Sequence, residues 1–319
     1  MKWINNKVIK WVLTRFGRKN YDIAKASYLR KLSDSDLQAA QPPLLIYQMG
    51  KVGSSTVYKS LQALKLDMPI YHPHFLTPEL IETYEAKRKQ YFGTERMGDL
   101  KHIWQCEYLS KQIKKGLNGK KWKVVTLVRD PIARNVSAFF ETLEVKLLNG
   151  SDQYKIKADS KSVYSFEIIT SVVNVAELSQ LFVEKFDHDT PLVFFDREVK
   201  VMLDIDVFLG EFPKSKGYKI YHGKYVDVLL IKLENLNDCA PRAFKEFLDI
   251  DGFTLVNTNI GSEKNYAPIY QKLKNSITLP DVYIDEMYKS KYARHFYSEA
   301  EIEKFKTKWC KPEEYKITD

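Results

Sequence analysis

A short glycine-containing turn near the start of the chain has the residue types that bind an anion. The apolar run Leu44–Met49 predicts a buried strand, and Ser55–Leu66 has its apolar residues at helical spacing. Between them, Gly50 and Gly53 permit a tight turn and a close approach of the backbone to a ligand. A strand, a glycine-containing turn and a helix start in this order predict a loop that binds a phosphate-like group.

The donors of this loop are an ammonium group, hydroxyl groups and the amides at the helix start. The residues concerned are Gly50, Lys51, Val52, Gly53, Ser54, Ser55 and Thr56. The spacing differs from the Walker A pattern because Lys51 comes before the second glycine, and no magnesium-binding acid is evident after an apolar strand. The loop therefore suits a phosphate-like group held without the usual nucleotide–magnesium arrangement. The simpler alternative is a plain helix start with glycine and serine caps.

A second motif, VRDPIARNVSAFF, follows the clearest predicted strand, Trp122–Val128. Arg129 stands at the end of that strand, and Asp130 and Pro131 are residue types favoured at a helix start. Ligands of open parallel sheets bind beyond the carboxyl ends of the strands, so we expect Arg129 on the same edge as the loop. Its guanidinium can bind a phosphate in a forked geometry, and Ser137 can add a hydroxyl. The alternative for Arg129 is a surface ion pair.

Two histidines, His72 and His74, lie two residues apart in the segment IYHPHFL. In an extended chain they share one face, and the segment follows the first predicted helix of the sheet, so it can return near the loop. A neutral histidine can take the proton of a hydroxyl group. We favour His72 as this base and His74 as the residue that orients the acceptor, although Pro73 bends the segment and leaves the order open. The alternatives are two surface histidines, or a zinc site, which lacks a third ligand nearby.

The alternation of strand and helix patterns predicts an α/β fold with three layers and a central parallel sheet. Further strands are expected at Leu192–Phe195 and Val226–Leu233, and a helix at Pro131–Leu148. Ser298 and Glu301 have the spacing of a capping box that opens a final helix.

Residues 1–31 have the pattern of a basic amphipathic helix. The polar stretch Ser33–Gln41, followed by two prolines, is the best candidate boundary, so we predict a helix and linker over residues 1–40 and an α/β domain over residues 41–319. The helix can lie on an anionic membrane surface, or it can pack on the domain with its cations in water.

The composition is that of a globular protein, with 44% hydrophobic residues, 29% charged residues and a net charge of +9. The positive charge indicates an anionic partner, but it is spread along the chain and no nucleic-acid-binding module is evident. The cysteines are far apart and form no CxxC pair, which predicts free thiols and no metal centre. No membrane-spanning stretch or secretory signal is evident, so we expect a cytoplasmic protein, with the inner membrane surface as the place that the N-terminal helix would favour.

Together, the two motifs resemble those of the sulfotransferase superfamily, which uses 3′-phosphoadenosine 5′-phosphosulfate (PAPS). The resemblance implies that the loop from Lys51 to Thr56 holds the 5′-phosphosulfate. It also implies that the strand-end Arg129 and the serine eight residues on, Ser137, bind the 3′-phosphate. Gly50 stands where many members have proline before the lysine, which we expect to alter the stiffness of the loop and not the chemistry.

Within the superfamily, the chain resembles carbohydrate sulfotransferases, especially bacterial capsular polysaccharide synthesis proteins, in the stretches GSEKNYAPIYQKLK and YKSKYARHFYSEAEI. The resemblance implies a P-loop-like, sulfotransferase-type domain over residues 41–319, and it assigns Lys264 to a late loop that closes over the nucleotide. In heparan-sulfate uronosyl sulfotransferases a His-x-His motif at the corresponding place supplies the base, which implies that role for His72 or His74.

The predicted function is transfer of a sulfuryl group from PAPS to a hydroxyl of a carbohydrate acceptor, without a metal. Lys51 and the loop amides would stabilise charge on the phosphosulfate, including the bridging oxygen as it leaves, and His72 or His74 would act as base. One alternative is a nucleotide-dependent kinase with a variant phosphate loop, which the absent Walker spacing disfavours. The other is a non-catalytic protein that binds an acidic glycan or a membrane surface. It would not explain why Lys51, Arg129 and Ser137 occur together.

Overall fold

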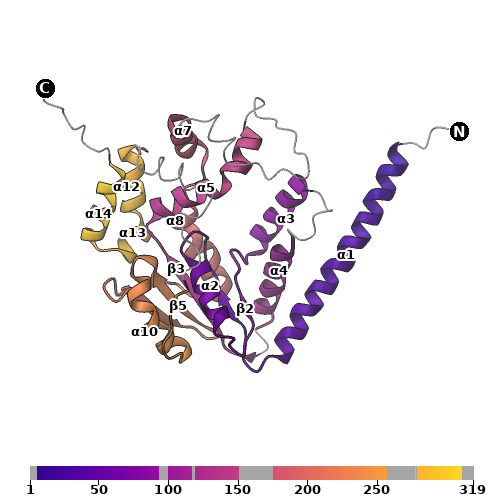
Figure 1. Cartoon of the computed structure of the whole chain (residues 1–319), viewed down its shortest axis with the longest axis horizontal. Coiled ribbons are helices and arrows are strands. Elements are labelled where there is room, and N and C mark those ends of the chain that lie inside the picture. The colour runs from indigo at the N-terminus through magenta and orange to yellow at the C-terminus, as the bar shows by residue number, and fades with distance from the viewer. Residues whose placement is uncertain are drawn as a thin grey trace.

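The structure is a computed structural model that describes residues 6–92, 100–116, 119–150, 175–256, 277 and 279–310. Its centre is a five-stranded sheet in the order β2-β1-β3-β5-β4. The strands are β1 (Leu44–Ile46), β2 (Ile70–Tyr71), β3 (Trp122–Val128), β4 (Tyr218–His222) and β5 (Val226–Lys232). Neighbouring strands are parallel except that β4 pairs with β5 in the antiparallel direction. This mostly parallel sheet with helices around it (Figure 1) confirms the predicted α/β class.

Helices lie between successive parallel strands along the chain, as crossover connections require. They are α1 (Asn6–Gln38), α2 (Ser54–Ala63), α3 (Pro78–Phe92), α4 (Lys101–Lys114), α5 (Pro131–Gly150), α7 (Val175–Lys185), α8 (Thr190–Phe194), the π-helix η4 (Phe195–Val199), α9 (Lys200–Leu203), the 3₁₀-helix η5 (Leu233–Asn235), α10 (Leu236–Leu248), α12 (Asp281–Lys289), α13 (Lys291–Phe296) and α14 (Glu299–Trp309). Both α2 and α5 begin within one residue of the predicted helix starts.

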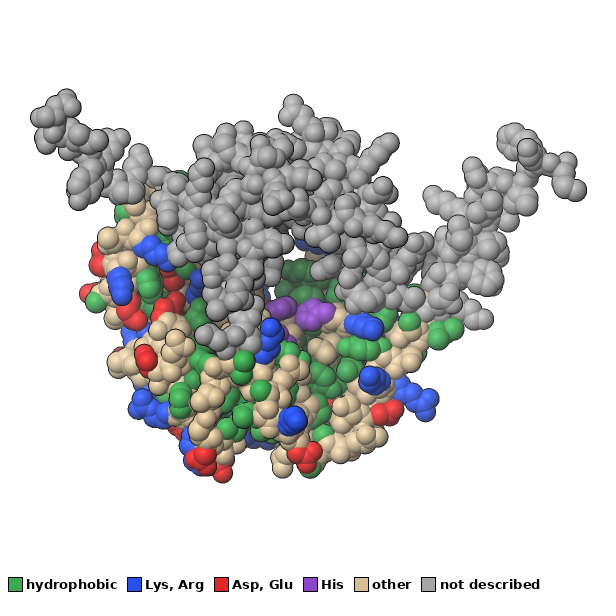
Figure 2. Space-filling view, in the orientation of Figure 1, with side chains coloured by type: hydrophobic (Ala, Val, Ile, Leu, Met, Phe, Trp, Pro, Cys, Tyr) green, Lys and Arg blue, Asp and Glu red, His purple; other side chains and the backbone are tan. Residues whose placement is uncertain are grey.

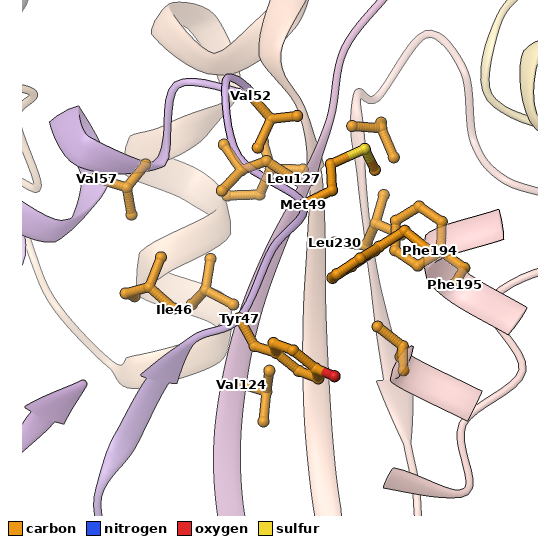
Figure 3. Close-up of a cluster of buried hydrophobic side chains, with 14 of the residues drawn as sticks. Ile46, Tyr47, Met49, Val52, Val57, Val124, Leu127, Phe194, Phe195 and Leu230 are labelled. Atoms are coloured by element: carbon orange, nitrogen blue, oxygen red, sulfur yellow. The ribbon is translucent and has the colours of Figure 1, made fainter. Parts of the chain in front are cut away.

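Helices cover both faces of the sheet. Successive residues of a strand point to opposite faces, so Ile46 and Tyr47 at the end of β1 mark the two sides. Figure 3 shows Val57 of α2 on the side of Ile46, and Phe194 of α8 on the side of Tyr47. The rings of Tyr47 and Phe194 make an edge contact with centroids 5.5 Å apart. All four side chains are buried, so the sheet lies between two layers of helices.

The stretch Leu192–Phe195, predicted as a strand, is helical, and that prediction is wrong. Helix α8 ends at Phe194 and continues directly into the π-helix η4. A short apolar run has the same composition in a buried strand as in a buried helix, and Pro191 in the first turn of α8 favours the helix. The strand that completes the sheet is β4 (YKIYH), which has no predicted counterpart.

The C-terminal half of α1 packs on the domain through polar and aromatic contacts to α4. Trp104 Nε1 donates to the Tyr21 hydroxyl at 3.0 Å, and Lys25 Nζ lies 2.5 Å from Glu107 Oε2. The carboxylate of Asp36 accepts from the Tyr108 hydroxyl at 2.7 Å. Because α1 continues to Gln38, most of the polar stretch predicted as a linker is the end of this helix. Residues 21–38 of this helix therefore pack on the α/β domain.

Several smaller predictions can also be compared with the structure. All three cysteines are free, with Cys106 and Cys239 buried and Cys310 exposed. The predicted capping box opens α14, because Glu301 N donates to Ser298 Oγ at 3.3 Å and Ser298 N donates to Glu301 Oε2 at 2.9 Å. In the part of the chain that the structure describes, no helix combines the length and the hydrophobicity needed to cross a membrane.

Candidate functional site

The turn after β1 has a backbone shape that few sequences can adopt. Gly50, Lys51 and Gly53 have positive φ angles of 82°, 63° and 83°. A side chain at Gly53 would also collide with Leu233, because a Cβ built there lies 2.4 Å from Leu233 Cδ1. The chain then enters α2 at Ser54. Left-handed residues directly before a helix start make a concave backbone whose amides can converge on an anion. We call residues 50–56 the anion loop.

Two arginines, Arg129 after β3 and Arg134 in the first turn of α5, hold the carbonyl side of the anion loop. Arg134 is buried, and its guanidinium donates to Met49 O at 2.9 Å and to Gly50 O at 3.3 Å. Arg129 is half-buried and donates from Nη1 to Lys51 O at 2.9 Å. With the loop carbonyls engaged in this way, the opposite side of the loop presents its amides. The structure thus brings Arg129 onto the same edge as Lys51, where the motif order predicts it.

Ser137 and Lys264 are the other two residues predicted to bind the cofactor, and the structure describes only Ser137. Ser137 is half-buried on α5, one helical turn after Arg134 and therefore on the same side of the helix. Lys264 lies outside the described residues.

The end of β3 is held by a tyrosine from α13. The hydroxyl of Tyr292 accepts from Arg129 N at 3.0 Å and donates to Arg129 O at 2.9 Å, so it satisfies both backbone groups of that residue. Next to it, Asp130 N donates to Glu234 Oε1 at 2.8 Å, and the Tyr297 hydroxyl donates to Glu234 Oε2 at 3.1 Å. Burial raises the pKa of Glu234. These contacts fix the backbone that positions the Arg129 guanidinium.

Asp130 caps α5 as predicted and has a further role that its sequence context did not indicate. Its Oδ1 accepts from Ile132 N at 3.1 Å and from the Tyr288 hydroxyl at 2.9 Å. Its Oδ2 accepts from Trp309 Nε1 at 3.3 Å. Burial raises the pKa of Asp130. One carboxylate therefore links the start of α5 to α12 and α14.

The two predicted histidines lie against the anion loop, and the side chain of Gln48 joins them to it. Gln48 is fully buried, and its Oε1 accepts from the backbone amide of Gly50. Its Nε2 lies 3.1 Å from His72 Nε2 and 2.5 Å from His74 Nδ1. Ser54 Oγ lies 2.9 Å from the same Nε2 atom of His72. Gln48 was absent from the sequence prediction, although it directly precedes the glycine-containing turn.

The hydrogen bonds of Gln48 constrain the proton on His72. The amide of Gly50 can only donate, so Gln48 must present its oxygen to Gly50 and its NH₂ group to the two histidines. His72 Nε2 therefore accepts from Gln48, and the neutral ring carries its proton on Nδ1. His74 Nδ1 also lies 3.3 Å from the backbone oxygen of Gln48, so either tautomer of His74 has a partner. Because Ser54 Oγ lies 2.9 Å from His72 Nε2, this atom is beside the anion loop, and it can receive a proton once the Gln48 NH₂ group no longer donates to it.

Burial, together with the neighbouring His74 and His102, lowers the pKa of His72 to about 3. The ring is therefore neutral at neutral pH. His74 is exposed, and its ring lies 5.0 Å from that of His72 and 5.3 Å from that of His102. His102, which has no motif around it in the sequence, is thereby brought into the same cluster.

Glu198 holds the segment that carries the histidines, and the sequence prediction missed it. This buried carboxylate of η4 accepts from Leu76 N at 2.6 Å and from Thr77 N at 3.3 Å. It also accepts from the hydroxyls of Thr77 and Tyr47. Its neighbour Asp196 lies inside the same π-helix. Glu198 stands between the exposed Arg197 and the buried Val199, so no local pattern in the sequence indicates its role.

The described residues include no group of three or more His, Cys, Asp or Glu side chains arranged to hold a metal ion.

A family model matches part of the chain. No curated protein and no solved structure matches the chain. Residues 169–298 match the model of the family described as "Putative capsular polysaccharide synthesis protein". The matched stretch is less than half of the chain, and it includes Glu198, Glu234, Tyr292 and Tyr297, which hold the site. The stretch that supports the anion loop and the histidines is therefore similar to a family named for capsular polysaccharide synthesis.

Proposed function

We propose that this protein transfers a sulfuryl group from PAPS to a hydroxyl group of a carbohydrate. The observation that carries the proposal is the meeting of three features at one sheet edge. They are an anion loop with Lys51, the Nη1 atom of Arg129 2.9 Å from Lys51 O of that loop, and the Nε2 atom of His72 2.9 Å from Ser54 Oγ of the same loop. The family match over residues 169–298 supports an acceptor from polysaccharide synthesis.

The chain's residues divide the work of this reaction. The acceptor oxygen forms a bond to sulfur while the bond from sulfur to the bridging oxygen breaks, and that electron pair remains on the 5′-phosphate. Lys51 and the amides at the start of α2 stabilise the charge that develops on the departing oxygen, which is the type of stabilisation that contributes most in many enzymes. The proton of the acceptor hydroxyl passes to His72 Nε2. The products are a sulfate ester, 3′-phosphoadenosine 5′-phosphate (PAP) and a proton.

The low pKa of His72 fits a base only when the anion is bound. At about 3, the free site keeps the ring neutral but weakly basic. A phosphosulfate in the anion loop brings negative charge close to Nε2, and an opposite charge nearby favours the protonated ring. The cofactor therefore increases the basicity of His72 in the complex that reacts.

Arg129 and Ser137 are proposed to select the cofactor. A guanidinium binds a phosphate through paired hydrogen bonds, and the Ser137 hydroxyl can add a further hydrogen bond. A 3′-phosphate is present on PAPS and absent from ATP, so contacts to it distinguish the two nucleotides. Tyr292 and Glu234 hold the backbone at Arg129 and Asp130 for this purpose.

Calorimetric titration of PAP into the metal-free protein tests the proposal. We expect micromolar binding that Arg129→Ala abolishes, while Arg242→Ala, at an exposed arginine of α10, leaves it unchanged. A parallel titration with ATP and Mg²⁺ is expected to show weak binding or none. Absence of PAP binding, or a preference for ATP with Mg²⁺, would overturn the proposal and favour a nucleotide-dependent kinase.

A further inference from the structure

The histidines belong to a longer row of ring side chains that runs from α2 to α3. Adjacent rings in this ring row, in spatial order, are Tyr58, His72, His74, His102, Phe75 and Tyr84. The centroid distances between neighbours are 5.0, 5.0, 5.3, 5.9 and 4.4 Å. The row therefore starts next to the anion loop and leads away from it, and only its first part is needed for the proposed chemistry.

The far end of the row is an aromatic surface that the solvent can reach. Tyr84 is 43% exposed, whereas the ring beneath it, Phe75, is 6% exposed. The two rings are nearly parallel, with an angle of 6° between their planes. Leu80, one turn earlier on α3, is 36% exposed. Figure 2 shows histidine side chains in the middle of this face with hydrophobic side chains beside them.

A flat ring held from below is suited to a ligand that has an apolar face and polar edges. Stacking on Phe75 fixes the Tyr84 ring before any ligand arrives, so little side-chain entropy is lost on binding. Sugar rings have this character, because their axial C–H groups form apolar faces while their hydroxyls point outward. A cation is also present, since Lys87 Nζ lies 5.9 Å from the centroid of the Tyr84 ring. Lys101, next to His102 in the chain, is exposed as well.

We infer that the outer part of the ring row, Tyr84 and Phe75, binds a ring of an acidic saccharide. Several ring contacts separate Tyr84 from His72, so the ligand spans more than one sugar. The carboxylate of one sugar would lie near Lys87, and a hydroxyl of another would reach the histidines. As a statement about the acceptor, this inference rests on the proposed function. As a statement about a saccharide site, it stands on the rings and the lysine alone.

Titration calorimetry with a hexasaccharide of alternating glucuronic acid and N-acetylglucosamine tests the site. We expect the wild-type protein to bind it and Tyr84→Ala to weaken binding about tenfold, while Tyr84→Phe retains the stacking surface and the affinity. The matched control is Tyr225→Ala, at a tyrosine that is 51% exposed in the β4–β5 connection, and its affinity should equal that of the wild type. Maltohexaose, which is neutral, is expected to bind more weakly.

Three results would overturn the inference: no binding of the acidic hexasaccharide to the wild type, equal affinity of Tyr84→Ala, or equal affinity for maltohexaose. A lower melting temperature of Tyr84→Ala with unchanged affinity would likewise assign Tyr84 to packing. PAP titration into the same variants separates the two proposals. If PAP binds but the hexasaccharide does not, the saccharide site fails alone. If the hexasaccharide binds through Tyr84 and PAP does not bind, the sulfuryl-transfer proposal fails and the site stands.

Discussion

Two regions of the chain contribute to the site in different ways. Most of the groups proposed to touch reactants lie between residues 51 and 137, with Lys264 as the exception, and several groups that hold them in place lie within residues 169–298, the stretch that matches the capsular polysaccharide family model. Glu198 holds the histidine segment, and Tyr292 holds the backbone of Arg129. The family model thus matches this supporting region and not Lys51, Arg129 or the two histidines.

The two regions differ physically in how far their polar groups are buried. In the supporting region, Glu198 and the Tyr292 hydroxyl are buried and hydrogen-bonded to backbone groups. In the reacting region, Lys51 and Arg129 are half-buried and His74 is exposed. Removing a buried partner leaves a polar group without hydrogen bonds, whereas removing a half-exposed cation lets water replace it. Substitutions in the supporting region should therefore change the free energy of unfolding, and those in the reacting region should change the rate of sulfuryl transfer.

The largest effect is expected at Lys51. Lys51→Ala should reduce turnover with PAPS about a hundredfold or more, since it removes a cation that stabilises the leaving oxygen, while the melting temperature stays near that of the wild type. Lys59→Ala, at an exposed lysine of the adjacent helix α2, is the control and should retain full turnover. Steady-state kinetics and thermal melting of both variants measure the two effects. Wild-type turnover in Lys51→Ala would contradict the assigned role.

Glu198 should show the opposite pattern. Glu198→Ala removes the acceptor for the amides of Leu76 and Thr77 and for the Tyr47 hydroxyl, all of them buried. The free energy of unfolding should fall by about 3 kcal/mol, because each unsatisfied group costs about 1–3 kcal/mol. Urea unfolding measures this, and Glu303→Ala, at an exposed acid of α14, should change it by less than about 0.5 kcal/mol. Equal stability of Glu198→Ala and the wild type would remove the distinction between the regions.

Much of the fold could be predicted because the strong patterns are local. The strand Trp122–Val128 is found with the predicted bounds, since a run of that length that is apolar except for Lys123 and Thr126 fits a strand buried on both faces. The prediction for Leu192–Phe195 failed because four apolar residues carry no period that separates a helix from a strand. The antiparallel edge strand β4 was missed because its buried and partly exposed residues do not alternate, so its pattern is weak.

The residues of the candidate site also divide into those that local sequence patterns predict and those that they do not. Lys51, Arg129 and the two histidines could be named from the sequence, because turn and strand-end positions limit where such residues can point. Gln48, Glu198 and Tyr292 could not, because their roles come from contacts that only the folded chain creates. The Glu198 contacts, for example, join residues separated by 121 or more positions in the chain. No spacing rule reaches across such distances.

Tyr292 lies at the boundary between the regions, and its hydroxyl should affect both stability and cofactor binding. Tyr292→Phe removes one group that bonds to both Arg129 N and Arg129 O. We expect a loss of about 1–2 kcal/mol in the free energy of unfolding and a several-fold weaker affinity for PAP, with turnover at saturating PAPS unchanged. Tyr225→Phe, at an exposed tyrosine, is the control for both measurements. Unchanged stability and affinity in Tyr292→Phe would show that the Arg129 backbone needs no such support.

The smallest effect concerns His72, a half-buried residue of the reacting region. Its pKa in the folded protein is about 3, below the ordinary value of 6.5. As the pH falls below 6.5, the unfolded chain therefore binds a proton at His72 that the folded chain does not, and stability decreases. From about pH 7.5 to about pH 5.5, the free energy of unfolding should fall by about 1 kcal/mol on account of this residue.

His72→Gln isolates that contribution, because it removes the titrating ring and keeps a polar side chain of similar length. Urea unfolding of the wild type and of His72→Gln at both pH values gives the difference, and the slope with pH should be smaller in the variant. His222→Gln is the matched control, since the His222 side chain is 72% exposed. If His72→Gln and the wild type show the same pH dependence, folding does not lower the pKa of His72, and burial does not keep its ring neutral.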